Sequence, residues 1–241
     1  MSNRNRNLAI GGVLGLAIAV LAVWFFIFRD TAPPEASLED AVGSVSSTTL
    51  DAGSSGGSLD GTWTIDTTVG DGVLDAGSYV GYRVQEELAT IGAKTAVGRT
   101  PAVTGSFAFS GTTLTAGEIV ADVTQLTSDD SRRDGAIRRQ ALETGTFAEA
   151  SFILTEPVDL GVDPANGEPF TAEATGDLTI HGVTRTVTVP ISGQLVTDTV
   201  VVVGGIEIAF ADYDIDKPTA GIVLSVDDVG EMEFQLFLAR S

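Results

Sequence analysis

The sequence predicts an all-β protein in which one antiparallel sheet closes into a barrel with a single inserted helix, preceded by one N-terminal transmembrane helix. Three observations lead to this prediction. Apolar and polar residues alternate repeatedly from Thr62 onward, turn residues separate the alternating runs, and an uncharged apolar run extends from Leu8 to Phe28. Alternation with period two is typical of strands that bury one face, and short turns between such runs favour antiparallel hairpins.

The apolar run from Leu8 to Phe28 has the length of a membrane-spanning helix. It would span roughly 31 Å, which matches a hydrocarbon core of about 30 Å. A cleaved signal peptide is the alternative, but such peptides have a shorter apolar stretch that ends in small residues. This run ends in the bulky segment Trp24 to Phe28. We expect an uncleaved anchor with a cytoplasmic N-terminus, because Arg4 and Arg6 precede the run and only Arg29 follows it.

Composition divides the chain into three parts. We assign residues 1–29 to the membrane anchor, residues 30–59 to a flexible linker and residues 60–241 to the barrel domain on the extracytoplasmic side. The linker assignment follows from Pro33-Pro34 and from a stretch rich in Ser, Gly, Thr and acidic residues, which is too polar to bury. A flexible chain of this length reaches about 30 Å.

The charge and the cysteine content exclude several classes of function. With 33 acidic and 13 basic residues and a net charge of −20, the chain repels nucleic acid. It has no cysteine and one histidine, so disulfides, thiolate chemistry and the common zinc sites are excluded. The segment Asp212 to Asp216 fails the calcium-loop pattern, which would need glycine at Lys217 and glutamate at Val223. We expect no metal site and no cofactor.

The candidate strands follow one another along the chain with turn residues between them. Their apolar faces consist of Trp63, Ile65, Thr67 and Val69; Val103, Gly105, Phe107 and Phe109; Leu178 and Ile180; Val187, Val189 and Ile191; Ile206, Ile208 and Phe210; and Met232, Phe234, Leu236 and Leu238. His181, the only histidine, is expected in a two-residue hairpin turn in which Gly182 supplies a positive φ.

One segment, Ser128 to Glu143, has the pattern of a helix instead. Ser128 is the expected N-cap and Gly145 the expected C-terminal stop. The expected apolar stripe consists of Ala136, Ile137, Gln140, Ala141 and Leu142. Four arginines cluster in this segment, at positions 132, 133, 138 and 139. We interpret them as surface salt-bridge partners of nearby acids; contact with a ligand phosphate at the barrel mouth is the alternative.

Six segments stand in an order that is typical of one known family. They are Gly61 to Asp66, Ser78 to Val84, Val103 to Phe107, Ser128 to Phe147, Gly176 to Arg185, and Ala211 to Ile215 with Lys217-Pro218. Through these segments, residues from about Gly61 to Ala239 resemble the YceI-like family of bacterial lipid-binding proteins. Gly135-Ala136 departs from the aromatic or histidine residues that are common in the helix of the family.

The resemblance implies an extended lipocalin-like barrel of eight antiparallel strands. It also implies a long apolar cavity that holds a polyisoprenoid or isoprenoid-quinone chain, and an extracytoplasmic location. Alternation by itself leaves open whether the interior is hollow or filled by side chains.

We therefore expect a non-catalytic, membrane-tethered protein that binds an isoprenoid lipid or quinone. The candidate wall residues are the larger side chains of the apolar strand faces: Trp63, Ile65, Tyr82, Phe107, Phe109, Leu178, Val187, Val189, Phe210, Phe234 and Leu236. Two alternatives remain open. One is an envelope interaction or scaffold protein with a filled barrel and no ligand, and the other is an enzyme acting on a lipid head group through His181 and Asp212.

Overall fold

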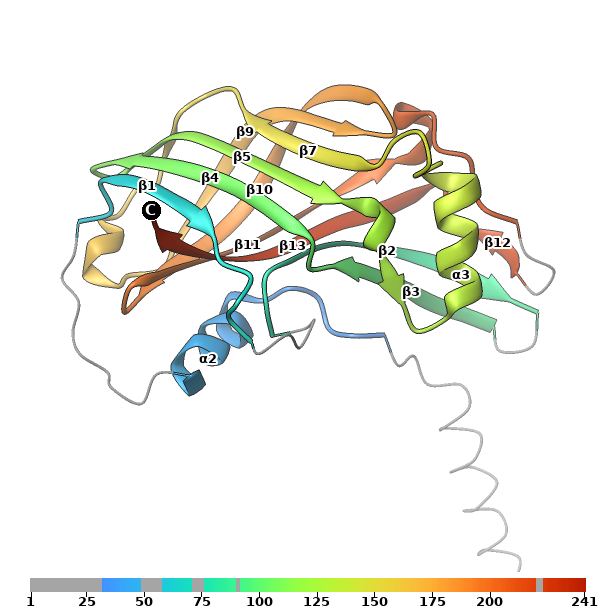
Figure 1. The fold of residues 1–241 in the computed structure, drawn as a ribbon, viewed down its shortest axis with the longest axis horizontal. Coiled ribbons are helices and arrows are strands. Elements are labelled where there is room, and N and C mark those ends of the chain that lie inside the picture. The colour runs from blue at the N-terminus through green and yellow to red at the C-terminus, as the bar shows by residue number, and fades with distance from the viewer. Residues whose placement is uncertain (1–31, 49–57, 71–75, 90–91, 220–222) are drawn as a thin grey trace, which may run out of the picture.

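The computed structural model describes residues 32–48, 58–70, 76–89, 92–219 and 223–241. In these ranges the strands form one antiparallel sheet, and eight of them close into a ring in the order β1-β4-β5-β7-β9-β10-β11-β13, with β13 pairing back to β1 (Figure 1). The ring strands are β1 (Gly61–Ile65), β4 (Val103–Ser110), β5 (Thr113–Asp122), β7 (Glu149–Leu154), β9 (Phe170–Ile180), β10 (Val183–Val196), β11 (Thr199–Ala209) and β13 (Val229–Arg240). The prediction of an all-β fold with a closed eight-stranded antiparallel barrel is confirmed.

The remaining strands extend the wall beyond the ring. They are β2 (Tyr79–Leu88), β3 (Gly92–Thr100), β6 (Thr127–Ser128), β8 (Val158–Asp159) and β12 (Val223–Val226). One edge of β13 pairs with β11 along its length, and the other edge pairs first with β2 and then with β1. The barrel is therefore bounded by β1 and β4 at one end and by β2, β3 and β6 at the other (Figure 1).

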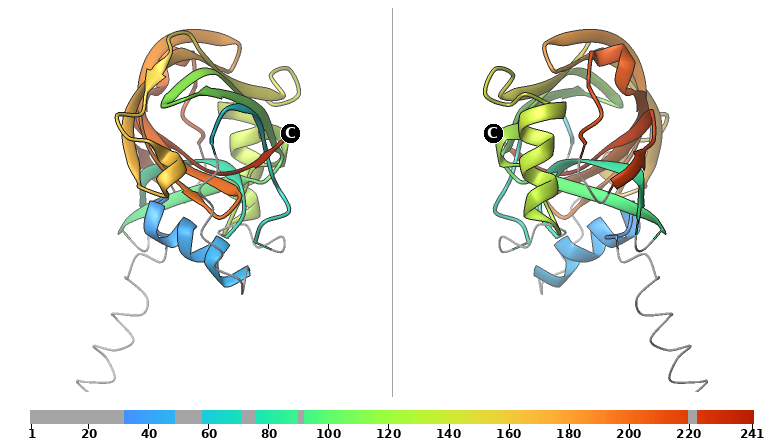
Figure 2. Two further views of the ribbon diagram at one scale, coloured as in Figure 1. Left: turned by 90° about the vertical axis from the view of Figure 1, so that its left-hand side faces the viewer. Right: turned by 90° about the vertical axis from the view of Figure 1, so that its right-hand side faces the viewer.

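Short helical segments complete the second end. Helix α3 (Ser131–Ala136) continues into a π-helical turn, η2 (Ile137–Ala141), and stands beside β2 and β3 (Figures 1 and 2). Two 3-10 turns, η1 (Val123–Gln125) and η4 (Phe210–Tyr213), also lie at this end, and a third, η3 (Pro164–Asn166), contacts β10 at the opposite end (Figure 1). Helix and sheet together therefore surround this end of the interior.

The strand β13 shows how alternation builds the core. Phe234, Leu236 and Leu238 face inward and belong to the main apolar cluster, together with side chains from β1, β4, β5, β9, β10 and β11. Glu231 and Glu233 alternate with them. Burial of such side chains contributes roughly 1.5–3 kcal/mol each, which makes the inward face the main stabilising surface.

A second apolar cluster lies on the outer surface of the barrel, where the segment predicted as a linker packs against β11 and β13. Helix α2 (Leu38–Thr48) packs through Ala41 and Val45 against Val201, Val203 and Phe237, below the barrel wall in Figure 1. The outer face of β11 and β13 is apolar here, so it needs a cover. The prediction of a flexible linker over residues 30–59 is therefore wrong for residues 32–48. Helix α2 covers an outer surface of the barrel that an alternating pattern of apolar and polar residues would leave exposed to solvent.

Two arginines, Arg99 buried and Arg83 largely buried, hold the chain that leads into α2. Arg83 donates to the Pro33 carbonyl at 3.0 Å, and Arg99 donates to the Pro34 carbonyl at 2.8 Å. Both guanidinium groups also pair with Glu233, whose side chain is only 2% exposed. Residues 33 and 34 are thus fixed to the outer surface of β2, β3 and β13.

The predicted helix is present but shorter and differently capped. Asp130, not Ser128, is the N-cap, and its carboxylate accepts from the Arg132 amide. The positive φ after the helix belongs to Glu143, at 43°, and not to Gly145. The carboxylate of Asp130 outcompetes the Ser128 hydroxyl because Ser128 is hydrogen-bonded to the buried Asp134. Gln140, predicted on the apolar stripe, is exposed.

The His181-Gly182 turn has the predicted geometry. His181 has φ 52° and Gly182 has φ 75°, as a two-residue hairpin between β9 and β10 requires. Within the described ranges, no helix has the length and apolar character needed to cross a bilayer. The predicted anchor from Leu8 to Phe28 lies outside those ranges.

Candidate functional site

The barrel interior contains an apolar cavity, here called the first chamber, with about 70 Å³ of space open to the centre of a water molecule. Its wall is almost entirely carbon, and among the described residues Ser151 alone contributes a polar side chain to it. The main lining residues are Phe107, Phe109, Leu114, Ile119, Phe152, Phe170, Ala174, Leu178, Val189, Ile191, Val202, Phe234 and Leu236. Such a wall selects a ligand by shape and apolar character.

A second cavity, the second chamber, has about 140 Å³ of equivalent space. It lies where β2 and β3 face α3, η2 and η4, and it combines an apolar floor with polar and charged residues. The lining includes Tyr82, Arg83, Val84, Glu86, Ala96, Thr100, Leu126, Arg133, Ile137, Ala141, Leu142, Ile180, Ile208, Phe210, Asp216, Lys217 and Glu231. This chamber has the groups that an amphipathic ligand needs at its polar end.

The two chambers adjoin each other. Val80, Ala150 and Met232 line both of them, so these three residues lie at the boundary between the apolar interior and the second chamber. Each of them comes from a different strand, β2, β7 and β13.

The structure brings most of the predicted wall residues together. Phe107, Phe109, Leu178, Val189, Phe234 and Leu236 line the first chamber, and Tyr82 and Phe210 line the second. Trp63, Ile65 and Val187 pack in the core without reaching either cavity. The Trp63 indole donates to the Leu59 carbonyl at 2.9 Å, and Arg240 stacks on its ring.

Sequence reasoning missed the walls contributed by β5 and β7 and by the helical segments. Leu114 and Ile119 come from β5 and Phe152 from β7, and their alternation was a usable signal. Arg133 and Glu86 were not recognisable as a pair, because 47 positions separate them along the chain. Only the fold brings them together.

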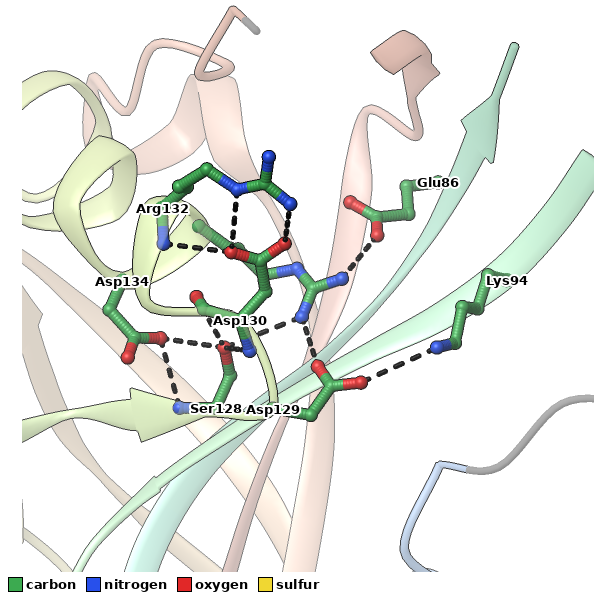
Figure 3. Close-up of polar contacts among 8 residues, drawn as sticks. Glu86, Lys94, Ser128, Asp129, Asp130, Arg132 and Asp134 are labelled. Carbon is green, nitrogen blue, oxygen red and sulfur yellow. Dashed lines mark hydrogen bonds and ion pairs between the residues drawn. The ribbon is translucent and has the colours of Figure 1, made fainter. Parts of the chain in front are cut away.

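A polar cluster lies on the wall of the second chamber, at the start of α3 (Figure 3). Arg133 donates to Glu86 at 2.5 Å and also pairs with Asp129, and Lys94 approaches Asp129 at 3.4 Å. Asp134 is buried and accepts from the Ser128 hydroxyl at 2.6 Å and from the Ser128 amide at 2.9 Å. The surface salt bridges expected for the arginines are therefore present only in part, since Arg133 is largely buried.

The pKa shifts follow from burial and from these contacts. Burial raises the pKa of the Tyr82 hydroxyl, which therefore stays protonated. Burial raises the pKa of Glu231, and the carboxylates of Glu35 and Glu233 raise it further. Hydrogen bonds from Arg132 lower the pKa of Asp130 to about 2. Burial lowers the pKa of Arg133, but its hydrogen bonds to two carboxylates raise that pKa by more, so the guanidinium stays charged.

The two groups considered for catalysis lie outside both chambers. His181 contacts Glu143 through Nε2 at 3.1 Å and the Tyr213 carbonyl through Nδ1 at 3.2 Å, and Asp212 offers its backbone carbonyl to Arg185. Neither residue lines either of the two chambers. In the part of the chain that the structure describes, no group of three or more His, Cys, Asp or Glu side chains could hold a metal ion.

Comparison with known proteins identifies the family. The model of the YceI-like domain matches residues 63–238, which is most of the chain. The chain belongs to the YceI-like domain family. A UPF0312 protein of Vibrio parahaemolyticus is 36% identical to it over 95 residues, which cover 38% of this chain and 47% of that protein. The matched stretch thus spans about half the length of this curated relative.

Solved structures show that this YceI-like domain shares its fold with other bacterial proteins. A polyisoprenoid binding domain from Saccharophagus degradans has a TM-score of 0.55 at 19% identity, over 75% of this chain and 98% of that one. BcnA of Burkholderia cenocepacia has a TM-score of 0.52 at 20% identity, over 66% of this chain and 95% of that one. At such identities the likeness shows the fold.

Proposed function

We propose that this YceI-like protein is a non-catalytic lipid-binding protein that holds an isoprenoid chain in the first chamber. The observation that carries the proposal is the wall of that chamber, built from inward side chains of the closed barrel and free of ionisable groups. The Saccharophagus degradans neighbour is described as a polyisoprenoid binding domain, which supports the same ligand class.

The energetic basis is removal of an apolar chain from water. Burial contributes about 0.8 kcal/mol per CH₂ group, so each five-carbon isoprene unit contributes a few kcal/mol. That gain offsets the loss of translational and conformational freedom on binding without directional contacts. Methyl-branched, unsaturated chains also suit a wall of phenylalanine, leucine and valine side chains.

The protein would act at a membrane, from which such lipids come. The apolar run from Leu8 to Phe28 is the proposed anchor, and the charge distribution around it supports a barrel on the extracytoplasmic side. The chain returns to the barrel surface at Pro33 and Pro34, only a few residues after Arg29. A tether this short would keep the barrel close to the lipid surface.

Lipid extraction from the full chain, purified from membranes in mild detergent, tests the proposal. We expect mass spectrometry to find a prenyl lipid in the organic extract of the wild type. Ala174→Leu places extra carbon atoms in the first chamber and should reduce the recovered lipid several-fold. Ala116→Leu makes the same change on the exposed face of β5 and should leave it unchanged. Absence of prenyl lipid from all preparations, or equal recovery from both variants, would overturn the proposal.

A further inference from the structure

Phenylalanine rings form much of the wall of the first chamber, and most of them lie over a glycine of a neighbouring strand. Among the described residues, five phenylalanines line this chamber, and for four of them the nearest glycine is so close that a Cβ added to it would meet the ring. These glycine–phenylalanine couples are Gly117 with Phe107, Gly176 with Phe152, Gly193 with Phe170, and Gly204 with Phe234. Each ring therefore occupies space that a side chain at the glycine position would otherwise need.

The sheet register brings the rings onto their glycines. Phe170 is directly opposite Gly193 in the pairing of β9 with β10, and Phe234 is directly opposite Gly204 in the pairing of β11 with β13. Directly opposed residues point to the same face of a sheet, so the missing side chains are on the inward face. A Cβ added at Gly193 would lie 2.5 Å from the Phe170 ring, and one at Gly204 would lie 2.6 Å from the Phe234 ring. Contacts this short are not tolerated, so either addition would displace the ring.

The rings lie between their glycines and the open space of the chamber. Phe170 and Phe234 line the first chamber, whereas Gly193 and Gly204 do not. A ring displaced from its glycine would therefore move towards the centre of the chamber. Because only about 70 Å³ is open there to the centre of a water molecule, one displaced ring would narrow the chamber considerably.

Glycine at these positions weakens the strands that contain it. In a strand, glycine is less favourable than alanine, because it loses more conformational freedom on folding and has no side chain to pack. A solidly packed barrel would not need this loss, since a larger residue beside a smaller side chain fills the same volume. With glycine, the ring lies close to the wall and leaves open space beyond it. The repeated couples therefore favour a chamber that is kept open.

We propose that the glycine–phenylalanine couples set the width of the first chamber, and that this width is what admits a methyl-branched chain in preference to a straight one. The proposal rests on the proposed function, because it concerns the same apolar ligand. Methyl branches make a prenyl chain wider than a straight alkyl chain, so a narrower chamber excludes the branched chain first. The four glycines are thereby positioning residues, which determine specificity through the rings that they hold.

The test compares two saturated alcohols, hexahydrofarnesol and dodecanol, which have the same main-chain length and hydroxyl group and differ only in methyl branches. The full chain, purified in digitonin, receives an equimolar mixture of both. Digitonin is a steroid detergent without an alkyl tail that would compete for the chamber. Mass spectrometry of the protein fraction after gel filtration then measures the ratio of branched to straight alcohol that the protein retains.

Gly204→Ala displaces the Phe234 ring, and Gly205→Ala is its matched control. Gly205 is the next residue of β11, and a Cβ added at either position would meet a backbone carbonyl oxygen, at 2.8 Å for Gly204 and 3.0 Å for Gly205. Only at Gly204 would the added Cβ also press on a phenylalanine ring. A double variant, Gly204→Ala with Phe234→Leu, shows whether the ring causes the effect, and urea unfolding verifies that each variant folds.

We expect the wild type to retain the branched alcohol in excess over its ratio in digitonin micelles alone. Gly204→Ala should lower the retained ratio about fourfold, the contribution of one methyl group that no longer has room. Gly205→Ala should keep the wild-type ratio, and the double variant should return to it. Gly117→Ala would place its Cβ 3.1 Å from the Phe107 ring, a milder contact that should lower the ratio less, and it provides the test if Gly204→Ala does not fold.

The outcomes separate this proposal from the proposed function. Retention of both alcohols by the wild type, with the same ratio in Gly204→Ala and Gly117→Ala, overturns the role of the couples and leaves apolar-chain binding in place. An equal loss of both alcohols in Gly204→Ala, an equal effect of Gly205→Ala, or no recovery in the double variant also overturns it, because the ring would then not set the width. Failure of the wild type to retain either alcohol overturns both proposals.

Discussion

The two chambers of the barrel differ in the way their walls are built. The first chamber is enclosed mainly by strands of the closed ring, and none of its described lining residues is ionisable. The second chamber is assembled from β2, β3, four short helical segments and single residues or short stretches of several other strands, and six of its lining residues are Arg, Lys, Asp or Glu. One is a product of regular alternation, and the other depends on loops and ion pairs from distant parts of the chain.

This difference separates two kinds of specificity. An apolar wall discriminates weakly between related chains, because one methylene group changes binding by only about 1–3 kcal/mol. A site built to hydrogen-bond a ligand rejects one that lacks the matching group far more strongly, because buried polar groups then stay unsatisfied. The first chamber therefore suits recognition of any long isoprenoid tail, and the second suits discrimination between head groups.

The largest expected effect is on the free energy of unfolding, and it concerns two phenylalanines that each lie against a glycine. Phe234 packs over Gly204 in the first chamber, and Phe210 packs over Gly230 in the second. Phe234→Ala should reduce the free energy of unfolding by about 3–5 kcal/mol, the usual cost of a large cavity in a packed core. Phe210→Ala should cost less, about 1–2 kcal/mol, because Phe210 is only half-buried.

Urea unfolding of both variants measures the two values. Equal costs would contradict the comparison, because they would mean that the second chamber is as tightly packed as the ring.

A smaller effect is expected from the ion pairs of the second chamber. Glu86→Gln removes one of the two carboxylate partners of the buried Arg133 and leaves Asp129 in place. We expect a loss of about 1–3 kcal/mol in the free energy of unfolding, below the roughly 3–5 kcal/mol that follows when a buried charge loses its only partner.

Glu87→Gln is the matched control for Glu86→Gln. Glu87 is the next residue of β2 and is exposed, so its neutralisation should change stability by no more than about 0.5 kcal/mol. If the two variants were equally stable, Glu86 would not contribute to holding Arg133 and the head of α3 against the sheet.

The sequence allowed prediction of the ring and of most of the first chamber. Strands β4, β9, β10 and β13 alternate regularly, so alternation alone places Phe107, Leu178 and Phe234 on the inward face. Alternation predicts which face of a strand points into the barrel, but it does not predict whether an inward-facing residue lines a cavity. That is why Trp63, Ile65 and Val187 were predicted as wall residues and lie instead in the packed core.

The docked helix and the second chamber depended on long-range contacts. The run Val200 to Val203 is apolar on both faces of β11, which indicates that something covers its outer side, but nothing in the run identifies α2 as the cover. In the same way, the pairing of Arg133 with Glu86 follows from the position of α3 against β2. Short polar segments show little periodicity, so the residues that they contact cannot be predicted from the sequence and are known only from the structure.

The smallest effect concerns pH and the rim of the second chamber. The N-cap Asp130 has its pKa lowered to about 2 by hydrogen bonds from Arg132, whereas an unfolded aspartate titrates near about 3.9. A carboxylate whose folded pKa is depressed stabilises the fold fully above the unfolded pKa. The stabilisation of α3 by Asp130 is therefore complete above about pH 4 and is lost as the pH falls towards 2.

An NMR titration of the Asp130 carboxyl carbon, with amide exchange of α3 as the local readout, checks this expectation. Asp130→Asn retains a capping oxygen but cannot titrate. In that variant, residue 130 should therefore cause no change in the protection of the α3 amides from exchange between pH 4 and about 2. Amides around the first chamber should be insensitive to the Asp130 titration, because none of its lining residues is ionisable. A midpoint near the unfolded value would contradict the proposed contact with Arg132, and a response that spread equally to the first chamber would mean that the two chambers do not respond independently.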